Sequence, residues 1–417
     1  MKTLDFLFNQ DTLIAGVDSG NISNKVTYIN EKGDIDSINV PSIIGINADT
    51  TAADLGEMEG ESKSFPDEYI LHVNINSPAL PKNRTNAYYT VGEYAQITAQ
   101  SQDLLETSGE AKDKLGAEIH VVTTLTALAL AAWKANKSDK INIPLSFGLP
   151  IEEARRTAKD KLDIFMGEHT VSAVDGPYKG KTITLNITDV KANVEGVTSY
   201  LGLIYDLVEG QIVKTKFRSQ LHKEFAVSDL GAGTFDIGLF DENGLNSRKS
   251  TNYSIGTNVY IDRIMQEIIN MPEFEKIVAR AKRSNITPKI TFSREEFMRK
   301  FIKPVIHKSI QDSEYTPIYE VTWQSKTADA TEIIEKHMKA YADEIQAKID
   351  AYFTSTNIGQ MIIVGGGLLF GYKFLKHLEE EDCLFPPNLI ESSFFTSKAY
   401  LLKNITSEIA KQNALAK

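Results

Sequence analysis

Two glycine-containing turns carry the residues of this sequence that are best suited to bind phosphate. Glycine lets backbone N–H groups approach an anion because it has no Cβ, a neighbouring hydroxyl adds a donor, and a carboxylate can hold a divalent cation, usually through water. One turn lies between two apolar runs, which predicts a strand–turn–strand phosphate site, although D-x-G-x-G also occurs in ordinary hairpin turns. It contains Asp229, Gly231, Ala232, Gly233 and Thr234.

The second turn lies near the N-terminus and has the same layout. An apolar run leads to Asp18 and Gly20, and another apolar run follows. Asp18 and Gly33 are separated by the same number of residues as Asp229 and Gly244, so the next turn also corresponds. Two unrelated hairpins would rarely agree in both features, and the sequence therefore predicts an internal duplication.

A third glycine-rich element follows the apolar run Met361–Val364, which reads as a buried strand. Its glycines are Gly365, Gly366 and Gly367, and the apolar residues after them indicate a helix.

These three elements, in this order, resemble the phosphate-1, phosphate-2 and adenosine motifs of the actin, sugar-kinase and heat-shock-chaperone ATPase superfamily. The resemblance implies an α/β actin-like fold, in which two duplicated ribonuclease-H-like domains surround a nucleotide cleft and each carries an inserted smaller subdomain. It implies ATP or GTP with Mg²⁺, and Asp18 and Asp229 near the metal. The nucleotide-binding residues that it implies are Asp18, Gly20, Asn21, Ser23, Lys25, Gly231, Ala232, Gly233, Thr234, Asp236, Gly256, Thr257, Gln266, Gly365, Gly366 and Gly367.

Some of these residues could instead have an ordinary structural role without any contact to the nucleotide. Lys25 either pairs with a phosphate or is a lysine at a strand edge. Gly256 and Thr257 resemble the turn that contacts adenosine or ribose, and on the helix after them Asp262, Gln266 or Glu267 could reach a ribose hydroxyl. Acids and amides on amphipathic helices are more often simply solvated.

The expected organisation has five parts. Domain I is expected at 12–225 with an inserted subdomain at about 47–115, domain II at 226–392 with an insert at about 270–330, and a C-terminal helix at 393–417 that returns to domain I. Hydrophobic periodicity predicts helices at 117–135, 200–207, 329–353 and 371–380, a strand at 141–147 and a hairpin at 168–192.

Within the superfamily, the sequence resembles the plasmid-segregation actins of the ParM group. The stretch Ala87–Ala95 is similar to their Y-x-V-G-E-x-A, and the segment that ends Val194-Glu195-Gly196 is similar to their V-x-V-x-P-E-S. The resemblance implies that Glu195 orients the attacking water and acts with Asp229 in catalysis. Val194 and Gly196 depart from the pattern, and Glu195 could instead be a solvated residue at a strand end.

Composition excludes several other classes of protein. The 417 residues carry a net charge of −11, whereas proteins that bind DNA directly present basic surfaces. The seven histidines lack metal-ligand spacing, and one cysteine cannot form an internal disulfide. Residues 1–12 lack a signal-peptide core and no apolar run is long enough to span a membrane, so a cytoplasmic location without membrane partners is expected.

The resemblance implies a nucleotide-dependent filament, built head to tail from copies of this chain, that hydrolyses ATP or GTP. Its cargo would be plasmid DNA, held by a DNA-binding adaptor at a plasmid centromere. The alternative is a monomeric small-molecule kinase or an ATP-dependent regulatory switch of the same superfamily. A chaperone is disfavoured because 417 residues leave no room for a long peptide-binding domain.

Overall fold

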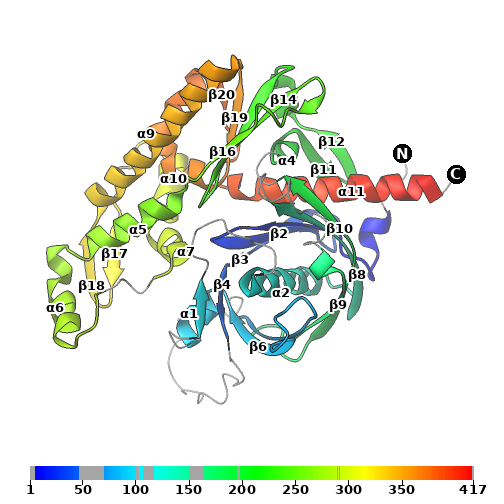
Figure 1. The fold of residues 1–417 in the computed structure, drawn as a ribbon, viewed down its shortest axis with the longest axis horizontal. Helices are drawn as coiled ribbons and strands as arrows, with labels where there is room; N and C mark the ends of the chain where they lie inside the picture. The colour runs from blue at the N-terminus through cyan, green and yellow to red at the C-terminus, as the bar shows by residue number, and fades with distance from the viewer. Residues whose placement is uncertain are drawn as a thin grey trace. The chain divides into compact units, whose positions relative to one another are not determined.

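The computed structural model describes residues 5–46, 70–99, 103–106, 117–149, 163–194, 198–288, 290 and 292–415. The chain divides into two compact units (Figure 1). The first unit comprises Met1–Gln220 and Phe394–Lys417, and the second comprises Leu221–Ser393.

A ten-stranded sheet forms the first unit, in the order β3-β2-β1-β8-β10-β9-β5-β6-β4-β7. Strands β1, β2 and β3 form an antiparallel meander, and β8 and β10 continue beside β1 in parallel. The strands are β1 (Ala15–Ser19), β2 (Ser23–Ile29), β3 (Ile35–Pro41), β4 (Ile43–Gly45), β5 (His72–Asn76), β6 (Asn86–Val91), β7 (Leu104–Glu106), β8 (Lys140–Leu149), β9 (Gly167–Asp175) and β10 (Thr182–Val194).

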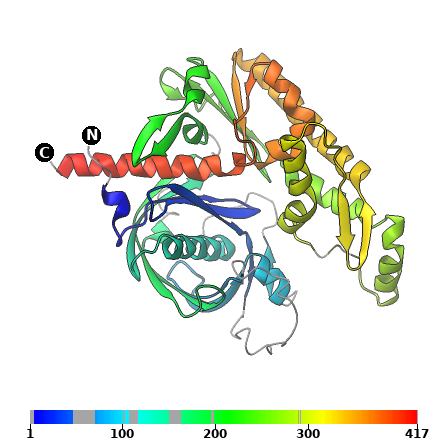
Figure 2. The ribbon, with the colours of Figure 1, turned by 180° about the vertical axis from the view of Figure 1, so that it is seen from behind.

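Two helices cover opposite faces of the meander in this unit (Figures 1 and 2). Helix α2 (Glu118–Lys134) is buried at every position from Ile119 to Trp133, because its apolar surface extends all round and the sheet curves about it. Helix α11 (Phe395–Leu415) lies directly on β1. A Cβ on Gly16 would stand 2.2 Å from the carbonyl oxygen of Ser397, so only glycine allows this approach.

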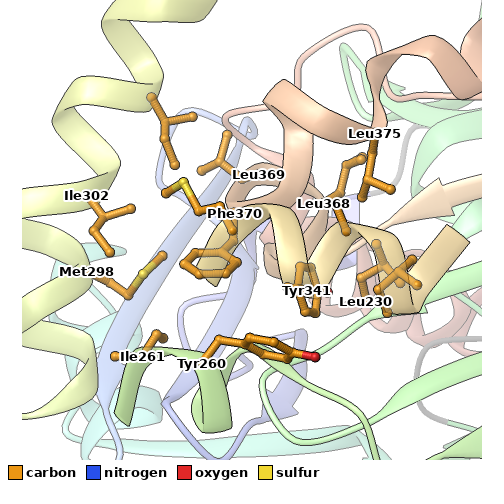
Figure 3. Close-up of a cluster of buried hydrophobic side chains, with 14 of the residues drawn as sticks. Leu230, Tyr260, Ile261, Met298, Ile302, Tyr341, Leu368, Leu369, Phe370 and Leu375 are labelled. Carbon is orange, nitrogen blue, oxygen red and sulfur yellow. The ribbon is translucent and has the colours of Figure 1, made fainter. Parts of the chain in front are cut away.

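The second unit repeats the central strand order on a smaller scale. Strands β14, β15 and β16 lie on one side of β13, and β19 and β20 continue in parallel on the other side. Helices α5, α9 and α10 form the core around Tyr260, Tyr341 and Phe370, whose rings meet edge to face (Figure 3). The elements are β13 (Phe225–Leu230), β14 (Phe235–Asp241), β15 (Gly244–Leu245), β16 (Thr251–Tyr253), α5 (Thr257–Ile268), α9 (Thr331–Thr356), β19 (Met361–Val364), α10 (Gly366–Leu375) and β20 (Cys383–Leu384).

Smaller elements complete the two units. The first unit adds α1 (Glu93–Thr98), α4 (Tyr200–Ile204), β11 (Tyr205–Val208) and β12 (Gln211–Lys214). The second unit adds α6 (Glu275–Arg283), α7 (Arg294–Phe297), α8 (Lys303–Gln311), β17 (Glu320–Trp323) and β18 (Lys326–Asp329). No helix in the described part of the chain combines the length and apolar character needed to cross a membrane.

The predicted α/β fold with a duplicated core is confirmed, and so are the helix at 117–135, the strand at 141–147 and the hairpin at 168–192. The helix predicted at 200–207 is wrong beyond Ile204. Residues from Tyr205 form β11, which pairs with β12 across a turn where Glu209 and Gly210 have φ of 49° and 72°. A hairpin forms here in place of the helix for two reasons. Its turn residues adopt the left-handed region, and β12 supplies hydrogen-bond partners for the backbone of β11. The helix predicted at 371–380 begins earlier, at Gly366.

Candidate nucleotide site

The first hairpin joins β1 to β2 through a tight turn. The N–H of Gly20 donates to the carbonyl oxygen of Ser23 at 3.0 Å, and a Cβ on Gly20 would stand 2.8 Å from that oxygen. The hydroxyl of Ser42 donates to the carbonyl oxygen of Gly20 at 2.7 Å. The turn is therefore closed by its own backbone. The side chain of Ser42, which lies between β3 and β4, adds a second hydrogen bond to it.

The second hairpin joins β13 to β14 and is closed by the same bond. The N–H of Gly231 donates to the carbonyl oxygen of Thr234 at 2.8 Å, and a Cβ on Gly231 would stand 2.9 Å from that oxygen. The turns that follow β2 and β14 also correspond, since each contains a glycine with positive φ, Gly33 at 86° and Gly244 at 99°. The Gly20 and Gly231 turns are thus closed by the same backbone hydrogen bond, and the N–H groups of the residues inside each turn are candidate phosphate donors.

The residues opposite the two turn acids differ in charge. Asp18 pairs across the ladder with Lys25, whose Nζ lies 3.5 Å from Oδ2 of Asp18. Asp229 pairs across its ladder with Asp236, whose Oδ2 accepts a hydrogen bond from the Thr234 hydroxyl at 2.9 Å. Lys25 and Asp236 therefore occupy equivalent positions with opposite charges.

The third glycine element packs directly behind the second hairpin. Gly365 has φ of 96°, which only glycine adopts freely, and a Cβ there would stand 2.2 Å from Oδ1 of Asp229. A Cβ on Gly367 would stand 2.2 Å from the hydroxyl of Tyr341, and burial raises the pKa of that tyrosine. Gly366 is exposed, and no described atom lies within 4 Å of its hypothetical Cβ.

The N-terminus of α5 is attached to the turn of the second hairpin. The N–H of Asn258 donates to the carbonyl oxygen of Ala232 at 2.9 Å, and a Cβ on Gly256 would stand 2.2 Å from the same oxygen. Asn258 is 5% exposed. Neither Oδ1 nor Nδ2 of its side chain has a hydrogen-bond partner among the described residues. The sequence did not indicate this residue as a site residue, because an asparagine at a helix start is usually read as a cap.

Two of the three candidates for ribose contact have protein partners. Asp262 forms a two-bond ion pair with Arg294, with both distances 2.8 Å. Glu267 accepts hydrogen bonds from Lys336 and is paired with His337, and the bond from Lys336 lowers the pKa of its carboxyl. Gln266 is exposed on α5. These ion pairs favour Gln266 over Asp262 and Glu267 as the residue that contacts a ribose.

Glu195 lies outside the described residues, as do residues 47–69 of the expected first insert. The strand that leads to Glu195, β10, is fixed near its end by Asn193, a buried residue. Its Nδ2 donates to the Ser146 hydroxyl at 2.8 Å and to the carbonyl oxygen of Phe147 at 3.2 Å. The strand end is thereby joined to β8, which pairs with β1 at Ala15–Val17.

The described residues contain no group of three or more His, Cys, Asp or Glu side chains that could hold a metal ion. A protein-only metal cage is therefore absent from this part of the chain. Asp18 and Asp229 are both compatible with another kind of magnesium site. In such a site Mg²⁺ keeps several waters, binds one or two carboxylates and is otherwise bound by phosphate oxygens.

Comparison with known proteins identifies the relatives of this chain. A family model described as the N-terminal domain of actin-like proteins matches residues 16–197. The solved structure of Bacillus thuringiensis ParM with ATP is 33% identical, and the match covers 96% of this chain and 100% of that one with a TM-score of 0.77. This chain belongs to the ParM family of actin-like proteins.

Other ParM structures extend the comparison. Bacillus thuringiensis ParM in its apo form is 32% identical over 98% of this chain and 99% of that one, with a TM-score of 0.66. A 15-stranded ParM filament from Clostridium botulinum is 19% identical over 95% and 99% of the two chains, with a TM-score of 0.62, which shows the common fold. No curated protein matched the sequence.

Proposed function

We propose that this ParM-family protein binds ATP or GTP with Mg²⁺, hydrolyses it, and assembles head to tail into filaments that segregate plasmid DNA through a DNA-binding adaptor. The observation that carries the proposal is the repeated turn. Gly20 and Gly231 each donate to the carbonyl oxygen three residues on, and an acid precedes each glycine by two residues. The near full-length similarity to a ParM solved with ATP supports the same ligand class.

The N–H groups of Gly20 and Gly231 are occupied in closing their turns. We therefore assign phosphate binding to the backbone N–H groups between them and their acceptors, at Asn21, Ala232 and Gly233, and to the Ser23 hydroxyl. The Thr234 hydroxyl joins them by turning its proton from Asp236 toward the phosphate. Lys25 adds a positive charge beside the first turn. We propose that each hairpin contributes donors to the phosphates of the nucleotide.

Hydrolysis needs an oriented water and stabilisation of the charge that develops on phosphate oxygens. Mg²⁺, when bound, supplies that electrostatic stabilisation. Asp229 would hold the hydrated metal in our assignment, and Gly365, which has no Cβ, leaves the room that its carboxylate occupies. Glu195 accepts a proton from the attacking water and orients it.

Assembly follows if the nucleotide-bound state is the one that self-associates. A head-to-tail contact is heterologous and does not close on itself, so it propagates into a filament. Loss of the γ-phosphate removes contacts with the hairpins and weakens that state. The relatives of this chain include ParM solved with ATP, with ADP and with AMPPNP, and a ParM filament.

Sedimentation of the purified protein tests the proposal. The protein is centrifuged with Mg²⁺ and no nucleotide, ATP, GTP or a non-hydrolysable analogue, and phosphate release is measured in parallel. We expect pelleting that requires nucleotide, persists with the analogue and reverses as ATP or GTP is consumed. Hydrolysis without pelleting at high protein concentration would contradict filament formation and favour the kinase or switch, which a screen of small-molecule acceptors would then separate.

A further inference from the structure

A buried polar cluster lies beneath the first hairpin. Nδ1 of His120 lies 2.9 Å from the Ser19 hydroxyl oxygen, and Nδ2 of Asn24 donates to that oxygen at 3.2 Å and to the Thr124 hydroxyl at 2.7 Å. His120 is 4% exposed, Ser19 is 1% exposed, and the other two side chains are fully buried. We call these four residues the Ser19 cluster.

The Ser19 cluster joins helix α2 to the end of the hairpin. Ser19 and Asn24 are the last ladder pair before the turn, and the pair before them is Asp18 and Lys25. His120 and Thr124 stand four residues apart at the start of α2, so they lie on the same face of that helix. Two side chains of the helix therefore contact both strands at the point where the turn begins.

Strand geometry separates the cluster from the ligand-facing groups. Successive side chains of a strand point to opposite faces of the sheet. Because Ser19 and Asn24 face α2, Asp18 and Lys25 face the other side. The orientation of the acid and of the glycine turn is thus set by how the intervening serine is held on the α2 face.

We propose that His120 is a positioning residue for nucleotide binding, which fixes Asp18 and Gly20 through the Ser19 hydroxyl. The inference rests on the proposed nucleotide site and adds a residue to it that touches no ligand. Loss of this bond leaves the buried Ser19 hydroxyl with the bond from Asn24 but without its direct bond to α2, which frees the hairpin end to shift. A shift of the backbone by a fraction of an ångström is enough to misalign N–H donors with a phosphate.

The first unit contains a matched control. Nδ1 of His169 lies 2.7 Å from the Ser77 hydroxyl, its Nε2 lies 2.8 Å from the carbonyl oxygen of Phe165, and both His169 and Ser77 are fully buried. His169 lies in β9 and Ser77 directly follows β5, so this second Ser–His pair is several strands from β1 in the sheet. It has the same chemistry and burial but does not contact either hairpin in the described structure.

The experiment compares His120→Leu, His120→Asn and His169→Leu in the full chain. Affinity for a fluorescent ADP analogue with Mg²⁺ and the Tm without nucleotide are measured for each. We expect both leucine variants to lower Tm, but only His120→Leu to weaken the affinity, by about tenfold. Asparagine retains a polar atom near the position of Nδ1, so His120→Asn should keep the affinity within about threefold of wild type.

The outcomes separate the two proposals. Wild-type protein that does not bind the analogue overturns the nucleotide site itself. Wild type that binds, with equal affinity in His120→Leu or equal losses in both leucine variants, overturns only the role of His120. Should His120→Leu fail to fold, Ser19→Ala removes the same hydrogen bond with a smaller change of volume. It should weaken affinity in the same direction, and wild-type affinity in that variant would overturn the inference.

Discussion

The two glycine hairpins share a backbone and differ in charge. Each turn is closed by the same N–H to carbonyl bond, yet Asp18 faces Lys25 whereas Asp229 faces Asp236. Like charges directly opposite each other in a ladder are destabilising unless something compensates them. The first hairpin therefore places a positive charge beside its turn acid, whereas the second places another acid at the equivalent position. In our proposal both turns present their backbone to phosphate, and the two hairpins differ in the charge that lies beside it.

The units differ again at the strand that would carry the catalytic acid. In the first unit β10 leads to Glu195, whereas in the second unit the corresponding edge strand β20 leads to Phe385, Pro386 and Pro387. We expect Glu195→Ala to slow phosphate release about 10²- to 10⁴-fold, the range that a general base contributes, with nucleotide affinity retained. Single-turnover phosphate release and analogue binding measure the two quantities.

The control for Glu195→Ala is Glu168→Ala on the neighbouring strand β9. Glu168 forms an exposed ion pair with Lys140, so its removal should leave hydrolysis unchanged. Wild-type rates in Glu195→Ala would remove this residue from the mechanism.

The next largest effect is expected at the turn acids. Asp229→Ala should weaken Mg²⁺-nucleotide affinity about 100-fold, because it removes the carboxylate that we assign to the metal. Asp18→Ala should cost less, about tenfold, since it frees the positive charge of Lys25 to attract phosphate. Titrations with Mg²⁺ and with EDTA measure both affinities. Equal losses in the two variants would contradict the division of roles between the hairpins.

Much of this arrangement follows from local spacing. The hairpins and the Gly365–Gly367 element were predicted because each is a short run in which strand, acid and glycine occur at fixed offsets. Those offsets determine the backbone of a turn almost by themselves. The left-handed φ of Gly33 and Gly244 confirms the second pair of turns for the same reason.

The rest depends on contacts between distant parts of the chain. His120 is about one hundred residues from Ser19, and Tyr341 meets Gly367 only after α9 folds onto α10. Nothing in the surroundings of a histidine within an apolar helix distinguishes a partner of the hairpin from an ordinary core residue. Strand β11 was likewise missed, because its pairing with β12 overrides an apolar pattern that also suits a helix.

Gly366 offers a sharper test of the adenosine element. Gly365 and Gly367 are both required by protein atoms, but a Cβ on Gly366 would meet no described atom within 4 Å. Since alanine favours helices over glycine by about 1 kcal/mol, Gly366→Ala should leave the Tm of the free protein unchanged or higher. If a nucleotide approaches this backbone, its affinity should fall about tenfold. Unchanged affinity would remove Gly366 from the site, and Gly367→Ala, which clashes with Tyr341, serves as the destabilised control.

Substitutions of Lys25 and Asp236, which lie opposite the two turn acids, test the difference in charge between the hairpins most directly. Their expected effects are the smallest. Without Mg²⁺, Lys25→Met should weaken nucleotide affinity about threefold, because it removes an attractive charge that is partly exposed to solvent. Asp236→Asn should have the opposite sign, since it removes a repulsive charge while its amide oxygen can still accept from the Thr234 hydroxyl. Both differences should shrink as ionic strength rises, because salt screens charges at this separation. Affinity titrations at low and high salt measure them, and changes of the same sign in both variants would show that the two hairpins do not differ in the charge that they attract.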